Sequence, residues 1–258
     1  MMNAAFDAMC IDAKYEAISV PPSGLSDAFR RLRDNGVRGL NVTMPHKASM
    51  AHLLDSLDDV SASVGAVNTV NAERGGYRGY NTDVDGILVP LAVRSLSPFR
   101  HAVALGTGGA ARAFCAAVHR TGSHSLTFLS RNPEKAQVFL DGLTAAFPAM
   151  DLQVASYRDA RSQRPDLVFN ASPAGSGGRP LPIEVAFLLD SRPVVFDAVY
   201  SPAETELTRL ASARGCMTIH GREMLLAQAI KALEIWTGRS CPTEPVREAL
   251  FASLEAAT

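Results

Sequence analysis

The sequence of 258 residues lacks the features of several specialised classes of protein. No apolar run approaches the roughly 20 residues that a helix needs to cross a bilayer. The N-terminal stretch, M-M-N-A-A-F-D-A-M-C, contains no basic region followed by an apolar one, as a secretion signal would. The formal net charge of −1 creates no global attraction for nucleic acid or for an anionic membrane. We therefore expect neither a nucleic-acid nor a membrane partner.

Cysteine is scarce, and its four positions, Cys10, Cys115, Cys216 and Cys241, form no C-x-x-C pair. A chain with neither a disulfide framework nor zinc-ligand spacing is typical of a cytoplasmic protein with reduced thiols. A catalytic cysteine is an alternative, but free cysteines are usually buried, which favours a role in core packing.

Short apolar runs of β type alternate with longer segments of helical period, which predicts an α/β fold with mostly parallel sheets. In the first part of the chain we expect a helix at the start, another with Leu25 and Phe29 on one face, and helical segments over Ala48–Leu54 and Ser56–Ser63. Strands in this part are expected over Lys14–Val20, Arg38–Thr43, Ala66–Asn71 and Tyr77–Asn81.

From about Asp83 onward, strands and helices alternate strictly. The expected strands are His101–Leu105, Leu126–Ser130, Leu152–Ala155, Leu167–Asn170, Val194–Ala198 and Cys216–Ile219. The expected helices are Ala110–Arg120, Pro133–Phe147, Ala203–Arg214 and Glu223–Thr237, and the Gly- and Pro-rich stretch Ser172–Pro182 is expected to be an irregular loop. The pattern indicates an α/β domain over residues 1–82 and a dinucleotide-binding domain over residues 83–221. We expect helices of residues 222–258 to complete the first domain, although periodicity alone does not establish this.

The stretch His101–Arg112, H-A-V-A-L-G-T-G-G-A-A-R, carries the strongest signal for a ligand on physical grounds alone. An apolar strand leads into G-x-G-x-x-A, formed by Gly106, Gly108 and Ala111, and a helix follows. The first glycine of such a loop permits the tight turn, the second lets the backbone approach a pyrophosphate, and the helix N-terminus offers free N–H groups. An ordinary βα turn is the alternative, but the flanking strand and helix favour nucleotide binding.

The tip of the next strand distinguishes between two dinucleotides. Domains that bind NAD usually carry Asp or Glu there to hold the ribose 2′-hydroxyl, whereas this chain has Ser130 and Arg131, followed by Lys135. A guanidinium can hold a 2′-phosphate with two hydrogen bonds, and the lysine adds a positive charge. A merely solvated basic turn is the alternative, but its position after a glycine-rich loop favours NADP as the cofactor.

Three polar motifs lie in the first part of the chain: N-V-T-M-P-H-K (Asn41–Lys47), G-A-V-N-T-V (Gly65–Val70) and G-Y-N-T-D-V-D-G (Gly79–Gly86). Each places polar side chains where a strand ends and a loop begins, which is the usual position of sites in α/β folds. Taken singly, the lysine, asparagine and first aspartate of these motifs have structural interpretations as a solvated side chain, a turn former and a helix cap.

Together these motifs resemble those of the shikimate dehydrogenase family, N-V-T-x-P-x-K, G-A-V-N-T and N-T-D-x-x-G. The resemblance extends from about Asn3 to Gly238 and includes the glycine-rich loop, D-L-V-F-N-A-S-P-A-G (Asp166–Gly175), F-D-A-V-Y-S-P-A-E-T (Phe196–Thr205) and G-R-E-M-L-L-A-Q-A (Gly221–Ala229). It implies two α/β domains with the active site in the groove between them. The implied reaction is the reversible NADP-dependent reduction of 3-dehydroshikimate to shikimate, without a metal.

The resemblance also implies roles for particular residues. By motif position, Lys47 resembles the catalytic lysine, and Asp83 its partner across the substrate. The implied substrate ligands are Thr43, Asn68, Tyr200 and Gln228, and the implied cofactor ligands are Gly106, Thr107, Gly108, Gly109, Ala110, Ser130, Arg131, Lys135 and Gly221. An ammonium group suits the reduction of a ketone because it can stabilise the developing alkoxide and deliver a proton.

The sequence departs from the family pattern at several places. Family members usually begin with a strand and a loop bearing Ser-x-Ser, whose hydroxyls bind the substrate carboxylate, and both precede the helix with which this chain starts. The usual Asn-Arg-Thr is replaced by Ser130-Arg131-Asn132, and the usual Asn-Ala-Thr-Pro by Asn170-Ala171-Ser172-Pro173. Two positions that are commonly uncharged carry Arg222 and Glu223.

Three interpretations stay open at this point. The first is a shikimate dehydrogenase, monomeric or homodimeric, and the second is a quinate or aminoshikimate dehydrogenase on the same scaffold. The third is a truncated homologue that binds the nucleotide but turns over little. Because the Ser-x-Ser loop is absent, we expect the chain to bind NADP and to have a substrate affinity roughly 10-fold or more lower for each lost contact.

Overall fold

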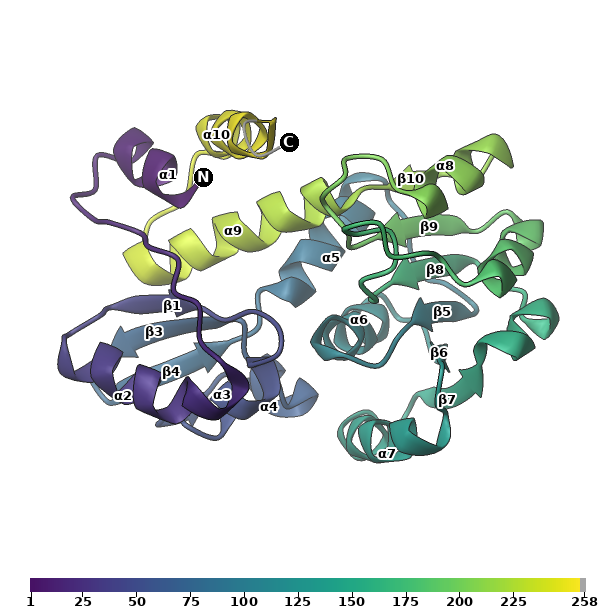
Figure 1. Ribbon diagram of the computed structural model, residues 1–258, viewed down its shortest axis with the longest axis horizontal. Coiled ribbons are helices and arrows are strands. Elements are labelled where there is room, and N and C mark those ends of the chain that lie inside the picture. The colour runs from purple at the N-terminus through teal and green to yellow at the C-terminus, as the bar shows by residue number, and fades with distance from the viewer. Residues whose placement is uncertain (256–258) are drawn as a thin grey trace. The chain divides into compact units, whose positions relative to one another are not determined.

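The computed structural model describes residues 1–255 and divides the chain into two compact units (Figure 1). Unit 1 comprises Met1–Ala62, Ala66–Thr82 and the chain from Leu226 onward, and unit 2 comprises Ser63–Gly65 and Asp83–Leu225. Among the described residues, no helix is both long enough and apolar enough to cross a membrane.

Unit 1 contains a four-stranded mixed sheet with the order β1-β3-β4-β2. Its strands are β1 (Gly39–Asn41), β2 (Ser56–Leu57), β3 (Thr69–Glu73) and β4 (Gly76–Tyr80). Strands β3 and β4 form an antiparallel hairpin, whereas β2 pairs with β4 in parallel. The helix predicted from Ser56 is wrong at its start, because Ser56 and Leu57 form this edge strand before α4 (Asp59–Val64) begins.

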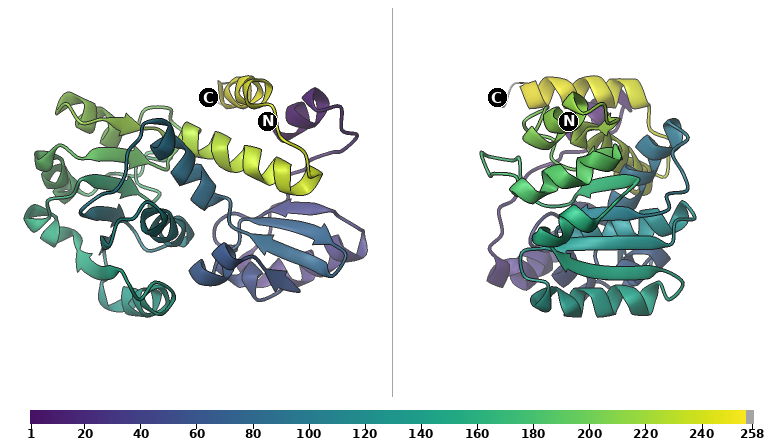
Figure 2. Two further views of the ribbon diagram at one scale, coloured as in Figure 1. Left: turned by 180° about the vertical axis from the view of Figure 1, so that it is seen from behind. Right: turned by 90° about the vertical axis from the view of Figure 1, so that its right-hand side faces the viewer.

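Helices cover both faces of this sheet. On one face lie η1 (Pro22–Gly24), α2 (Leu25–Asp34) and α3 (Lys47–Ala51), and α2 packs Leu25 and Phe29 into a cluster with Val70 and Tyr77. On the other face lies the part of α9 (Gly221–Thr237) that belongs to unit 1 (Figure 2). There the Trp236 indole N–H donates to the carbonyl oxygen of Val70 at 2.9 Å.

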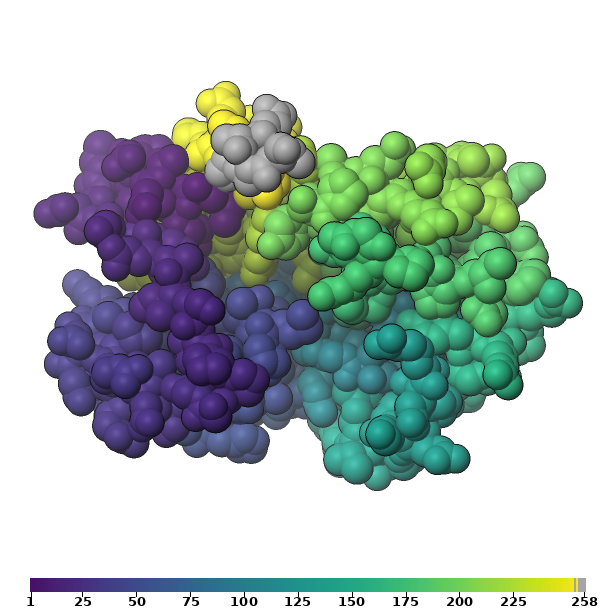
Figure 3. All heavy atoms as spheres, in the orientation of Figure 1, coloured from purple at the N-terminus to yellow at the C-terminus, as the bar shows by residue number. Residues whose placement is uncertain are grey.

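The two ends of the described chain meet in unit 1. Helix α1 (Met2–Ala8) packs against α10 (Thr243–Glu255), and the two lie side by side at the surface of the unit (Figure 3). Phe6, Leu233 and Val246 belong to the shared apolar cluster, which joins both helices to α9.

The strand predicted over Lys14–Val20 is wrong. This segment forms no ladder, and side chains hold its backbone instead: Tyr15 N–H donates to Asn3 Oδ1 at 2.6 Å, and His46 Nε2 lies 2.8 Å from the carbonyl oxygen of Val20. A cavity of about 250 Å³, lined mainly by apolar side chains, is bordered by both the segment and β1. Alternating polar and apolar residues therefore fold here as an extended segment without a strand partner.

Unit 2 contains a six-stranded, fully parallel sheet with the order β10-β9-β8-β5-β6-β7. Its strands are β5 (Ala102–Leu105), β6 (Ser125–Ser130), β7 (Asp151–Ser156), β8 (Leu167–Asn170), β9 (Val194–Asp197) and β10 (Thr218–Ile219). All six predicted strands and the predicted α/β class are thus confirmed. Strands β6 and β7 follow β5 on one side of the sheet, and β9 and β10 follow β8 on the other side. The strand order therefore reverses between the neighbours β5 and β8.

Alternate residues of each buried strand face different layers of helices. Val168 packs with the layer that contains η3 (Tyr157–Ser162), η4 (Ile183–Ser191) and α8 (Glu206–Ala213), whereas Phe169 stacks on Phe114 of α6 at 4.4 Å between ring centroids. The remaining helices of unit 2 are α5 (Asp83–Val93), α6 (Gly109–Arg120), η2 (Glu134–Ala136) and α7 (Gln137–Ala146). The stretch Ser172–Pro182 is the irregular loop that its composition predicts.

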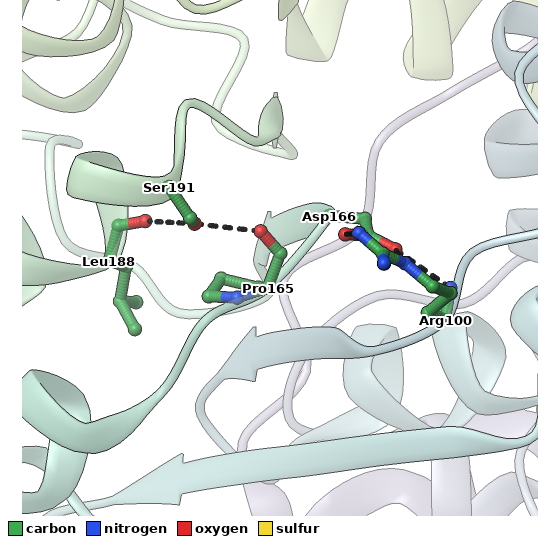
Figure 4. Close-up of polar contacts among 5 residues, drawn as sticks. All are labelled: Arg100, Pro165, Asp166, Leu188 and Ser191. Atoms are coloured by element: carbon green, nitrogen blue, oxygen red, sulfur yellow. Dashed lines mark hydrogen bonds and ion pairs between the residues drawn. The ribbon is translucent and has the colours of Figure 1, made fainter.

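Polar contacts fix the amino end of β8. The Asp166 carboxylate accepts a hydrogen bond from the Arg100 backbone N–H at 2.8 Å and forms an ion pair with the Arg100 guanidinium at 3.3 Å (Figure 4). The Ser191 hydroxyl donates to the carbonyl oxygen of Pro165 at 2.8 Å and also approaches that of Leu188. These contacts hold the start of β8 at the end of the sheet opposite the glycine-rich loop that follows β5.

Candidate active site

The glycine-rich loop lies at the carboxyl end of β5, as predicted. Gly106 has φ +97°, a conformation that L-residues with a Cβ rarely adopt, and its N–H donates to the carbonyl oxygen of Leu129 at 2.8 Å. Gly108 is the N-cap of α6, and a Cβ added there would meet no atom within 4 Å. The residues Gly106 to Ala110 therefore turn from strand to helix and leave an open approach to the N-terminus of α6.

The predicted phosphate-binding turn follows β6. Ser130, the last residue of β6, pairs in register with Ser156, the last residue of β7. Arg131 and Lys135 are exposed after this strand, and Asn132 Oδ1 accepts a hydrogen bond from the Lys135 N–H at 3.0 Å, which closes the turn.

A cavity of about 440 Å³ lies beside this turn. It is lined by Ser130, Arg131, Ser156, Tyr157, Arg158, Pro182 and Glu184. Two guanidinium groups against one carboxylate give the cavity an excess of positive charge, which suits a phosphate group. The sequence argument missed Arg158, although a basic residue just after the neighbouring parallel strand is a signal that could have found it.

In unit 1, the structure brings together two predicted substrate ligands that are 160 positions apart in the sequence, Asn68 and Gln228. The Asn68 amide donates to Gln228 Oε1 and to the Thr82 hydroxyl, both at 3.0 Å, and its Oδ1 accepts the Thr82 backbone N–H at 2.7 Å. Asn68 is 2% exposed. Its amide orientation is thereby fixed, and Thr82 is a member of this cluster that sequence reasoning missed.

The catalytic candidate of unit 1, Lys47, is the first residue of α3 and is half-buried. Its carbonyl oxygen accepts a hydrogen bond from the Val67 N–H at 2.8 Å, which holds the start of α3 beside the segment that carries Asn68. Thr43 is exposed in the preceding turn, where its carbonyl oxygen accepts the His46 N–H at 2.9 Å.

The remaining candidates belong to unit 2. Asp83 is the first residue of α5 and 2% exposed, a position where the partial positive charge of the helix N-terminus favours a carboxylate. Tyr200 is 45% exposed in the loop after β9. Gly221 begins α9, and a Cβ there would lie 2.4 Å from the carbonyl oxygen of Val199, so the close approach of two backbone segments requires this glycine.

Known proteins resemble this chain over nearly its whole length. Residues 1–70 match the family described as the shikimate dehydrogenase substrate binding domain, and residues 221–251 match the shikimate 5′-dehydrogenase C-terminal domain. The chain is 38% identical over 262 residues to the shikimate dehydrogenase (NADP(+)) of Symbiobacterium thermophilum, an alignment that covers 99% of this chain and 89% of that protein. The chain belongs to the shikimate dehydrogenase family.

Solved structures of shikimate dehydrogenase family relatives share the fold. The shikimate 5-dehydrogenase of Thermus thermophilus, in complex with NADP(H) and shikimate, has a TM-score of 0.83 and 29% identity, with 98% of this chain and 93% of that chain covered. The quinate dehydrogenase of Corynebacterium glutamicum, in complex with NAD, has a TM-score of 0.87 and 30% identity, with 98% and 92% covered. The expected two-domain α/β architecture is thus confirmed.

The open space at Gly108 gives a matched pair of variants. Gly108→Ala should leave the melting temperature unchanged or slightly higher, because φ is negative there and no atom is in the way. The same change should weaken NADPH binding by about 10-fold, since the new methyl group occupies the approach to the α6 N-terminus. Gly106→Ala, at positive φ, should instead lose about 1–3 kcal/mol of stability. Thermal melts and fluorescence titration with NADPH measure both effects. Native affinity for NADPH in Gly108→Ala would contradict the assignment of the α6 N-terminus as a cofactor-binding site.

Proposed function

We propose that this protein is an NADP-dependent shikimate dehydrogenase that reversibly reduces 3-dehydroshikimate to shikimate. The observation that carries the proposal is the pair of sites in one chain. Unit 1 holds Lys47 at the start of α3 and the Asn68–Gln228 amide cluster, and unit 2 holds the glycine turn and the cavity lined by Arg131. The names of the curated relatives and the ligands of the Thermus thermophilus structure support the same activity.

The residues of unit 2 fit a dinucleotide that carries a 2′-phosphate. When bound, NADPH supplies the hydride for the carbonyl carbon of the substrate. The open N-terminus of α6 presents N–H groups to a pyrophosphate, and Gly108 leaves space for it. Arg131 and Arg158 line the cavity at the tips of β6 and β7, where they can hold the 2′-phosphate and neutralise its charge.

The residues of unit 1 fit a polyhydroxylated acid with a ring ketone. Lys47 donates a proton to the oxygen on which negative charge develops during reduction. Asn68 and Gln228 each carry both a donor and an acceptor, which matches the hydrogen-bonding capacity of ring hydroxyls. Because Thr82 fixes the Asn68 amide, little conformational entropy is lost when a substrate hydroxyl binds to it. Asp83 of unit 2 is assigned to orient a further ring hydroxyl.

A second candidate function is the oxidation of quinate, which differs from shikimate in its ring substituents. The observation that favours it is the similarity to a quinate dehydrogenase at 30% identity over nearly the whole chain. That structure contains NAD, whereas the Arg131 cavity of this chain suits the additional phosphate of NADP. The basic cavity therefore favours the first candidate.

Lys47 and Asp83 should act on the chemical step, and Lys47, which is half-buried at the start of α3, should contribute little to folding. Lys47→Ala should lower turnover of shikimate by about 100-fold or more, the usual scale for a general acid–base group, with the melting temperature nearly unchanged. Asp83→Asn should also lower the turnover of shikimate. Steady-state kinetics and a thermal melt of each variant provide the measurement. If either variant turns over at close to the native rate, that residue leaves the catalytic assignment.

Arg131 should select NADP over NAD. Arg131→Ala should cost about 1.5–3 kcal/mol of NADPH binding, the range for a charged hydrogen bond, and should leave the weaker NADH binding unchanged. Arg120→Ala is the matched control, because Arg120 is an exposed arginine at the far end of α6. Titration of NADPH and NADH against the native protein, Arg131→Ala and Arg120→Ala measures the affinities. An equal loss for NADPH and NADH would show that Arg131 does not contact the 2′-phosphate.

A further inference from the structure

Two buried polar side chains lie side by side at the carboxyl ends of β8 and β9. Asn170 and Asp197 are the last residues of these strands, they pair in register, and both are 0% exposed. The Asn170 amide donates to Asp197 Oδ1 at 2.9 Å. A polar pair without access to water is stable only when its remaining hydrogen-bonding groups are also satisfied.

The Asp197 carboxylate binds the loop that follows β9. Its Oδ1 also accepts the Val199 N–H at 3.0 Å, and its Oδ2 accepts the Thr205 hydroxyl at 2.6 Å. Burial raises the pKa of Asp197 above its usual value, and the hydrogen bonds from Thr205, Val199 and Asn170 offset part of this rise. Every one of these contacts donates to the carboxyl group, which is the pattern of an ionised carboxylate.

The Asn170 side chain binds the loop that follows β8. Its amide also donates to the carbonyl oxygen of Ala174 at 3.0 Å, and its Oδ1 accepts the Ser172 N–H at 3.1 Å and the Ser172 hydroxyl at 2.7 Å. The Ser172 Oγ in turn accepts the Ala174 N–H at 3.2 Å. One continuous network therefore sets the positions of both loops.

The network borders the point where the strand order reverses. Ala171 N–H donates to the carbonyl oxygen of Leu105, the last residue of β5, at 3.1 Å. A Cβ added to Gly106 would lie 3.3 Å from Ser172 Cβ, so the β8 loop touches the glycine turn. Ligands of open α/β sheets bind outside the carboxyl ends of the strands at this reversal.

The order of the strands indicates which half of the dinucleotide reaches the network. The cavity with Arg131 lies at the tips of β6 and β7, and the open helix N-terminus follows β5. A dinucleotide with its 2′-phosphate in that cavity and its pyrophosphate at Gly108 extends in the opposite direction, toward β8 and β9. The half that carries the nicotinamide therefore meets the two loops that Asn170 and Asp197 hold.

We propose that Asp197, together with Asn170, is a positioning residue for the nicotinamide half of the cofactor. It acts through the Ser172–Ala174 segment and the Val199 backbone, and it does not contact the adenosine half. The inference rests on the proposed NADP-dependent function and adds to it the residues that set the geometry of hydride transfer.

The test compares Asp197→Ala with Asp166→Ala. Asp166 is also a carboxylate that holds a loop to this sheet, but at the amino end of β8 (Figure 4). Both variants should melt at a lower temperature. Only Asp197→Ala should raise the Kd for NADPH, by about 10-fold or more, while its Kd for 2′,5′-ADP, which fills only the adenosine end, stays native. Asp197→Asn should restore NADPH binding to within about 3-fold, because its amide oxygen can still accept from Val199 and Asn170.

A loss of stability alone cannot produce this pattern, since it would change the Kd for both ligands or for neither. Unchanged NADPH binding in Asp197→Ala, or an equal loss for NADPH and 2′,5′-ADP, overturns the proposal. If Asp197→Ala does not fold, Ser172→Ala decides by the same two titrations, because it removes one hydroxyl at the edge of the network. Failure of the native protein to bind NADPH would instead reject the proposed function itself.

Discussion

The parallel pairing of β5 with both β6 and β8 is the constraint on which the nucleotide unit depends. It places the ends of all three strands at one edge of the sheet and sends the following connections in opposite directions from β5. The backbone groups at this edge need partners, and a ligand or a buried side chain can supply them. Gly108 leaves open space beside the N-terminus of α6, whereas the Asn170 and Asp197 side chains are hydrogen-bonded to one another.

Unit 1 holds two side-chain amides, those of Asn68 and Gln228, in fixed directions beside a small sheet. The Asn68 side chain contacts Thr82 and Gln228 at once, so residues from a strand end and from a C-terminal helix depend on one another for their orientation. The start of α3 is fixed beside them through the Val67–Lys47 backbone hydrogen bond. A substrate that binds such groups loses less entropy than one that must order them.

The sequence predicts the elements that a local residue pattern marks and misses features that depend on residues distant in the chain. The six strands of unit 2 are found because each is an apolar run between turn residues. The segment Lys14–Val20 has the alternation of a strand, but a strand also needs a neighbour, which no pattern within the segment reveals. The short helices η3 and η4 lack a 3.6-residue period. The Asn170–Asp197 pair becomes apparent only from the register of adjacent strands.

One chain combines a basic nucleotide cavity with a lysine and an amide pair that we propose bind a polyhydroxylated acid. The most direct measurement is kcat/KM of the native protein for shikimate and for quinate, each with NADP and with NAD, followed by absorbance of the reduced nucleotide. We expect turnover that is highest for shikimate with NADP, with NADP favoured by about 10-fold or more, the difference expected for the charged contacts to the 2′-phosphate. Preference for NAD, preference for quinate, or no turnover with any pair would contradict it.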